Sequence, residues 1–345
     1  MENGNVEVED ICVGEELMEE KDEEKYLGDV ISKDGRNLKN IQSRVNKGKG
    51  IARKILEILE GIPFGKLYFQ VAILLRNSLL VSNVLCNSEV WFNLTSSELN
   101  LLETVDLMLL RRILNAPKST PKEMIFLELG VMPLREIIRQ RRLNFLKYIL
   151  DQNNESIIYK VFEKQYENRT KKDWVTTVLA DLDLLGIDVT FANIQNTSKS
   201  KWKSTVRQSI KQNVIKELNM KKQSHSKVKE LKHSKLEMQQ YFLPKNQEMS
   251  KDEIQLIFQI RSKVTNVKMN LKGLYDSFEC EVCKDEDETQ KHIYECKQIW
   301  KIKGNFNDNI SEYENIMTGN VKEMLQVARI LKENLKINEN FKKKK

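Results

Sequence analysis

The stretch Cys280-Glu-Val-Cys283, followed after eight residues by His292-Ile-Tyr-Glu-Cys296, decides the fold of the C-terminal part of this chain. A two-residue gap lets one tight turn aim both sulfur atoms at a common point, and a His and a Cys four positions apart lie one above the other on a helical turn. Three thiolates and one imidazole fit a closed tetrahedral Zn²⁺ shell with no open position for a substrate. We therefore expect zinc in a structural role; the alternatives are chance clustering and an inert pair of buried thiols.

The composition is that of a charge-rich globular protein. Of 345 residues, 40% are hydrophobic and 31% charged, with only 5 Pro and 13 Gly, which favours long helices over a turn-rich β architecture. No apolar run approaches the roughly 18 residues of a membrane span. The acidic N-terminus is unlike a secretory or mitochondrial leader, and Cys12 and Cys86 are isolated, as expected in a reducing compartment. We expect an intracellular protein, nuclear or cytoplasmic, with no membrane partner and no small-molecule substrate.

The net charge of +7 conceals an asymmetry. Residues 1–25 carry 11 acidic and 2 basic side chains, so subtraction leaves 55 basic and 39 acidic groups, or +16, in residues 26–345. A body this basic indicates a polyanionic partner, most often nucleic acid. The alternative is lysine-rich helix surface that only solvates the chain.

Hydrophobic periodicity changes once along the chain. Residues 4–12 alternate, and Lys25 to Ser32 is β-leaning and precedes the turn dipeptide Asp34-Gly35, so we expect a short hairpin. Helical spacing follows, and Thr95 with Glu98 forms a capping-box start. The predicted helices cover about 38–59, 64–87, 96–116, 133–150, 155–167, 172–185, 198–221, 226–241 and 250–269, with a linker at 185–200.

Two basic features lie among these helices. Arg135, Arg139 and Arg142 share one helix face, with Arg141 and Lys147 nearby, and the planar fork of Arg suits phosphate. The run from Lys199 to Lys235 contains Arg207 and also Trp202, a flat ring for base stacking. The alternatives are a solvated helix face for the arginines and a core position for Trp202.

Catalytic motifs are absent from the sequence. There is no GxxxxGK[ST] loop, no GxGxxG and no GxSxG. Asp181, Asp183 and Asp188 are spaced to different faces, so we interpret them as surface charges and not as a Mg²⁺ site. His225 and His233 have no nucleophile or carboxylate near them in the sequence. We expect no enzymatic activity from this chain alone.

The stretch Tyr26-Leu27-Gly28-Asp-Val-Ile-Ser-Lys-Asp-Gly35, followed by Asn40-Ile41 and Arg44, resembles the end of the palm and the start of the thumb in LINE-type (non-LTR) retrotransposon reverse transcriptases. The Cys280, Cys283, His292 and Cys296 set, with Glu288-Thr289 before the His, resembles the zinc knuckle that ends many such polyproteins. The resemblance spans about residues 24–300; other stretches that fit it are 72–80, 89–91, 103–112, 122–130 and 133–135.

The resemblance implies a nucleic-acid-binding role. Tyr26, Leu27 and Gly28 would form the primer-grip hairpin, and thumb helices would track the backbone of RNA, DNA or an RNA–DNA hybrid. The implied contacts are Lys47, Lys49, Arg53, Arg139 and Arg142, to which the basic features above add Arg135, Trp202 and Arg207. The family's paired palm aspartates, fingers and endonuclease have no counterpart in this sequence. We therefore interpret the chain as a C-terminal fragment and expect that it does not polymerise DNA. The rival hypothesis is a helical protein-interaction or adaptor protein with a purely structural zinc site.

The sequence of the knuckle is not that expected of a phosphate-binding zinc knuckle. Its loop is acidic (residues 285–288), and the usual glycine after the second cysteine is absent. We expect it to serve folding, with base or protein contact through Phe278, Ile293 and Tyr294.

The expected fold class is mainly α, with a short N-terminal β-hairpin, a thumb-like helical bundle, a further helical domain and a small C-terminal zinc knuckle. The expected boundaries are 1–35 for the acidic lead-in and palm-like hairpin, 36–150 for the thumb-like domain, 151–270 for the basic helical domain, 271–300 for the CCHC knuckle and 301–345 for a helical, basic tail.

Overall fold

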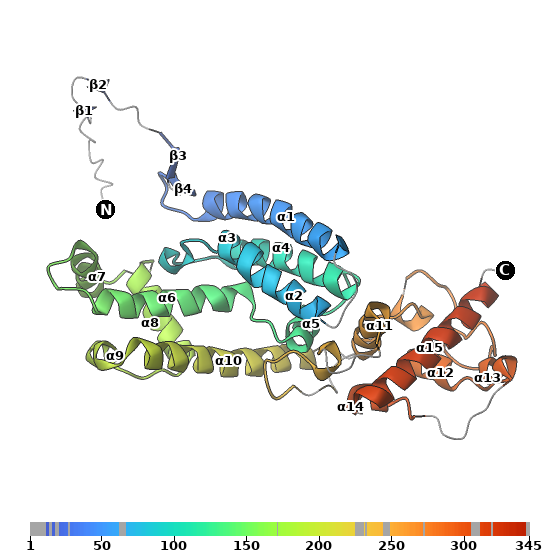
Figure 1. Ribbon diagram of the computed structural model, residues 1–345. Coiled ribbons are helices and arrows are strands. Elements are labelled where there is room, and N and C mark those ends of the chain that lie inside the picture. The colour runs from blue at the N-terminus through green and yellow to red at the C-terminus, as the bar shows by residue number, and fades with distance from the viewer. Residues whose placement is uncertain are drawn as a thin grey trace.

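The computed structural model describes residues 12–13, 16–17, 21–26, 28–61, 67–170, 172–224, 231, 233–243, 249–271, 273–304, 311–318 and 320–342. Over these residues the mainly α fold with an N-terminal hairpin is confirmed (Figure 1). The elements in chain order are β1 (Cys12–Val13), β2 (Glu16–Leu17), β3 (Glu23–Tyr26), β4 (Asp29–Ser32), α1 (Leu38–Gly61), α2 (Tyr68–Leu75), the π-helical η1 (Arg76–Val81), α3 (Ser82–Val84), the 3₁₀ turn η2 (Ser88–Val90), α4 (Ser96–Leu114), α5 (Lys122–Leu129), α6 (Leu134–Leu150), α7 (Ile157–Glu167), α8 (Trp174–Leu184), α9 (Phe191–Asn196), α10 (Lys199–Gln223), η3 (Gln240–Phe242), α11 (Lys251–Arg261), η4 (Lys268–Asn270), α12 (Gln290–Glu295), α13 (Lys297–Lys303), α14 (Asn315–Thr318) and α15 (Val321–Lys342).

The hairpin forms within residues 23–32, where β3 and β4 pair antiparallel with Tyr26 opposite Asp29. Gly28, at φ 88°, supplies the left-handed residue that a two-residue turn requires. Leu27 and residues 4–11 lie outside the described residues. The Asp29 carboxylate ties the hairpin to the helices, since it accepts hydrogen bonds from Arg44 at 2.7 Å, Asn40 at 2.8 Å and Asn87 at 2.5 Å.

Helix α1 buries one face against α3 and α4, as its spacing of apolar residues predicts. Gly48 lies in that face. A Cβ atom at this position would lie 2.7 Å from Val84 Cγ2 and 3.2 Å from Val105 Cγ1, so the missing side chain permits the close approach of α1 to its neighbours.

The long helices α1, α4, α6 and α10 follow one another as layers (Figure 1), and each contacts the next. A buried ion pair joins two of the inner elements: Arg76 of η1 donates to both Asp106 oxygens of α4, at 2.6 and 2.5 Å. The guanidinium also donates to the Met132 carbonyl at 3.0 Å. A buried charge pair satisfied in this way specifies the geometry between the layers.

The C-terminal elements form a second group at one end of the layers (Figure 1). Helix α15 contacts α11, α12, α13 and α14. The segment 301–345, expected as a tail, therefore includes a helix that packs on the cysteine- and histidine-bearing segment, because Val327, Ala328 and Leu331 give α15 an apolar face.

Four expected elements differ from the structure. The helix expected at 250–269 is α11, which ends at Arg261. Residues 64–87 form α2, η1 and α3 in succession over the described part, with a π-helical turn in the middle. The expected linker at 185–200 contains α9, whose Ile194 is buried. The expected helix at 226–241 is wrong for residues 233–239, which are not helical: the side chain of His233 and the N–H of Gln239 both bond to Glu128 of α5, and these tertiary bonds override local helix propensity.

Candidate metal centre and nucleic-acid interface

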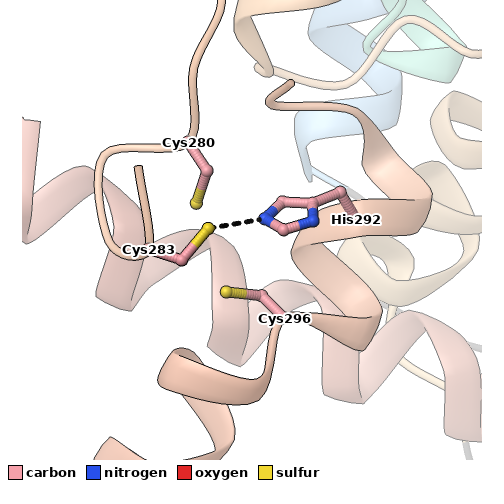
Figure 2. A group of neighbouring side chains, drawn as sticks. All are labelled: Cys280, Cys283, His292 and Cys296. Carbon is pink, nitrogen blue, oxygen red and sulfur yellow. Dashed lines mark hydrogen bonds between the residues drawn. The ribbon is translucent and has the colours of Figure 1, made fainter. Parts of the chain in front are cut away.

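Cys280, Cys283, His292 and Cys296 converge, with all four ligand atoms within 4.8 Å of one another. Figure 2 shows the three thiols and the imidazole facing a common centre, with Cys283 Sγ 3.3 Å from His292 Nε2. A tetrahedral shell with bonds of about 2.0–2.3 Å has edges of about 3.3–3.8 Å, so only small side-chain movements would close it around an ion. The group can hold a metal ion, and its soft donor set is compatible with zinc.

Two local structures position the ligands. The first is a turn stabilised by the N–H of Lys284 donating to the Cys280 carbonyl at 3.0 Å and that of Cys280 donating to the Glu286 carbonyl at 2.8 Å. Lys284 adopts φ 63° there, the left-handed conformation that the usual glycine adopts without strain. The second is α12, capped by Thr289, with Cys296 at its C-terminal end.

Glu286 orients the histidine ligand. Its Oε2 lies 3.1 Å from His292 Nδ1, which assigns the ring proton to Nδ1 and leaves the Nε2 lone pair facing the thiols. A carboxylate behind a ligating imidazole also raises the basicity of the ligand. One residue of the acidic loop therefore supports the metal site directly.

Burial makes the thiols poor acids in the absence of a metal. It raises the pKa of Cys280 to about 12, a rise that backbone N–H groups of Cys283 and Val282 only partly offset. Burial also raises the pKa of Cys296. Metal ligation requires thiolates, so the charge of a bound cation would supply the compensation that this environment lacks.

Helix α15 packs against the segment that bears the four candidate metal ligands. Lys342 Nζ lies 2.6 Å from Oε1 of the fully buried Glu288, and Asn334 donates to the carbonyls of Ile293 and Tyr294 at 2.9 and 3.2 Å. Ile293 and Tyr294 are buried, which corrects the expectation that they are available for base or protein contact. They serve instead as packing between α12 and α15.

The arginines of α6 are largely engaged within the protein. Arg142 is buried, donating to Asp181 Oδ2 at 2.6 Å and to the Trp91 carbonyl at 3.0 Å. Arg139 also donates to Asp181, at 2.8 Å, and pairs with Glu136. Arg135 lies 2.9 Å from Glu103. The spacing places these arginines on one side of α6 as expected, but that side packs against other elements.

Two related expectations are corrected. Asp181 is buried between Arg139 and Arg142, not a surface charge, because α8 packs against α6. Trp202 is also buried, and its Nε1 donates to the Leu143 carbonyl at 2.9 Å. It takes the core position that was the alternative to base stacking.

Four cations of α1, by contrast, lie at the protein surface. We define the α1 basic surface as Lys47, Lys49, Arg53 and Lys54, all exposed. In the part of the chain that the structure describes, no carboxylate lies within ion-pair distance of any of the four. The segment 35–56 contains no acidic residue, which explains the absence of local partners. Arg207 on α10 is likewise exposed.

Sequence reasoning missed a buried charge cluster around Glu128. Its Oε1 lies 2.9 Å from both His233 Nε2 and Arg261 Nη2, and its Oε2 accepts from the Tyr241 hydroxyl at 2.5 Å. The carboxylate partner of His233 is therefore Glu128, which lies 105 positions away in the sequence. The acidic residue within the otherwise apolar run Met124 to Leu129 was the one available signal.

Among the described residues, no helix combines the length and the apolar character needed to cross a bilayer. Comparison with protein-family models, with curated proteins and with solved structures finds no match for this chain.

Proposed function

We propose that this chain binds nucleic acid along the α1 basic surface, while a Zn²⁺ ion at the four-ligand site holds the C-terminal group of helices together. The observation that carries the proposal is the contrast between the two sets of cations. Arg135, Arg139 and Arg142 of α6 are neutralised by carboxylates within the protein, whereas the α1 cations are exposed and, among the described residues, without carboxylate partners. Unneutralised cations along a helix are what a phosphate backbone binds, with release of counterions.

Gly50 also favours binding of a partner along the α1 basic surface. It is exposed in the interior of α1, and no described atom outside the neighbouring backbone of α1 lies within 4 Å of a Cβ added there, so no packing contact among the described residues requires a glycine. A glycine inside a helix costs about 0.5–1 kcal/mol relative to alanine. Its lack of a side chain leaves the helix backbone open to close approach by a partner between Lys49 and Arg53.

The hairpin supports a nucleic-acid role through the resemblance to LINE-type reverse transcriptases. Tyr26 and Ile31 are 64% and 58% exposed, on a hairpin anchored to α1 through Asp29 and Arg44. In that family the matching hairpin grips the primer, and Tyr26, Leu27 and Gly28 are the corresponding residues here. The corresponding palm aspartates are absent from the sequence, so this chain alone would bind without extending a primer.

The second candidate function is an interaction or adaptor protein with an architectural zinc site. It is favoured by Ile157 and Val161 of α7, which are 82% and 54% exposed and line an apolar surface cavity. Titration of a labelled RNA–DNA hybrid at increasing salt separates the two. Nucleic-acid binding predicts an affinity that falls steeply as the salt concentration rises. The adaptor hypothesis predicts either no measurable binding of the hybrid or binding that does not depend on salt.

A further inference from the structure

A cavity of about 650 Å³ lies between the end of α3, the second half of α6 and the first turns of α10. This is within the range of roughly 300–1,000 Å³ that small-molecule sites occupy. Its lining includes the cations Arg141, Lys199 and Lys203, the carboxylate residue Glu89, and Tyr148. It does not include any residue of the α1 basic surface.

One part of the lining is suited to an anion. Arg141 is half-buried, with Nη1 directed to the Leu85 carbonyl and Ser88 Oγ, and no carboxylate among the described residues lies within ion-pair distance of it. Burial lowers the pKa of Arg141, and Glu89 offsets this only in part. Lys203 is exposed, with no ion pair among the described residues, and both Lys199 and Lys203 lie at the N-terminal end of α10, where the helix dipole favours negative charge.

Another part of the lining is suited to a flat ring. Tyr148 is 47% exposed and stacks on Phe145, with ring centroids 5.8 Å apart and an interplanar angle of 12°. This leaves aromatic surface at the cavity for a further ring.

We infer that this cavity binds a nucleoside phosphate, with the phosphate held by Arg141 and Lys203 and the base against Tyr148. The inference stands independently of the α1 basic surface. The nucleoside phosphate is either a free nucleotide or the phosphorylated end of a strand.

Calorimetric titration of the full chain with adenosine monophosphate, adenosine and inorganic phosphate tests the inference. The monophosphate should bind at least about tenfold more tightly than either part, since both ends of the cavity contribute. Lys203→Gln should weaken the monophosphate by roughly tenfold or more, as expected for a charge-assisted hydrogen bond. Lys216→Gln, which removes an exposed charge from the same helix away from the cavity, should leave the affinity unchanged.

Tyr148→Leu tests the base end of the cavity. Removing the exposed ring should reduce the preference for the monophosphate over phosphate, and thermal unfolding reports whether the variant remains folded. Competition by an oligonucleotide with a 5′-phosphate, but not by one without, would assign the ligand to strand ends, and absence of competition would assign it to free nucleotides. The inference is overturned if the monophosphate does not bind, if phosphate alone binds as tightly, or if Lys203→Gln and Lys216→Gln weaken binding equally.

Discussion

Glu128 and His233 are separated by 105 positions in the chain, yet Nε2 of His233 lies 2.9 Å from Oε1 of Glu128. Arg261 and Tyr241 bond to the same carboxylate, and Lys222 Nζ lies 3.5 Å from the other ring nitrogen of His233. This cluster joins α5, α10, the segment 233–243 and α11. It therefore connects the layered helices to the C-terminal group.

The first prediction concerns the charge of Glu128. Burial raises the pKa of this carboxyl, but the charge of Arg261 and the hydrogen bonds from His233 and Arg261 outweigh it and lower the pKa to about 2. Since the folded value lies below the unfolded value of 4.5, the contribution to stability is complete above about pH 4.5 and is lost as the pH falls toward 2. It amounts to on the order of 3 kcal/mol. Urea unfolding of the wild-type chain and of Glu128→Gln across this window should show the flatter pH dependence in the variant.

At pH 7, Glu128→Gln should itself cost roughly 3–5 kcal/mol, because it leaves the buried Arg261 without its anion. Glu57→Gln, at an exposed position of α1, is the matched control and should change the free energy of unfolding little. Equal effects of the two substitutions would show that the cluster does not hold the two groups of helices together.

The second prediction concerns the metal. We expect one Zn²⁺ per chain, with apparent stabilisation of the local fold on the order of 10 kcal/mol. Cys283→Ser should release the ion and raise hydrogen exchange over about residues 275–300, while the helices before residue 200 stay protected. Cys86→Ser should retain the ion. Glu286→Gln should weaken binding by roughly 10–100-fold, because it removes the carboxylate behind His292.

Native mass spectrometry of the purified chain checks the stoichiometry directly. A chain that contains no zinc, or one that retains zinc after Cys283→Ser, would contradict this prediction.

The third prediction compares two glycines of α1. Gly50→Ala should stabilise the chain by about 0.5–1 kcal/mol, because the position is helical, exposed and open. Gly48→Ala should destabilise it by roughly 1–3 kcal/mol, because the new methyl group overlaps Val84 and Val105. The same chemical change therefore has opposite signs two residues apart, and thermal unfolding of the two variants measures this directly. Two changes of the same sign would show that the packing of α1 on α3 and α4 is incorrect.

The fourth prediction concerns Arg142. Asp181→Asn should cost roughly 3 kcal/mol or more, because it leaves the buried Arg142 guanidinium without its counterion. Arg142→Ala should likewise lower stability and should not change the salt dependence of nucleic-acid binding, because this side chain is not at the surface. Denaturant unfolding measures the first effect and fluorescence anisotropy the second. If a folded Arg142→Ala chain has a slope of log affinity against log salt that is smaller in magnitude, Arg142 contacts the nucleic acid and this prediction is wrong.

The sequence predicted those parts of the structure whose causes are local. The Thr95–Glu98 capping box is present with both of its bonds, α1 begins at Leu38 and ends at Gly61, and the four metal ligands converge as their spacing indicated. In each case a short stretch of chain contains all the interacting groups, so periodicity and spacing carry the information.

The missed features depend on contacts between distant segments. Segment 226–241 has the composition of a helix, but its residues 233–239 are not α-helical, because His233 and Gln239 bond to Glu128. The spacing of Arg139 and Arg142 correctly predicted that they share one face of a helix. It could not predict that Asp181, from a distant helix, would pair with both of them. The cavity between α6 and α10 had no signal in the sequence, since its lining comes from three separate segments.

The most direct test of the central claim is the salt dependence of hybrid binding by Lys47→Gln/Lys49→Gln/Arg53→Gln. Its control is Lys118→Gln/Lys301→Gln/Lys336→Gln, three exposed cations outside α1 that give the same change in net charge. Each phosphate contact contributes about −0.9 to the slope of log affinity against log salt on duplex. The account predicts that the α1 variant has a slope smaller in magnitude by about 2–3, while the control keeps the wild-type slope. Equal slopes in all three chains would contradict it.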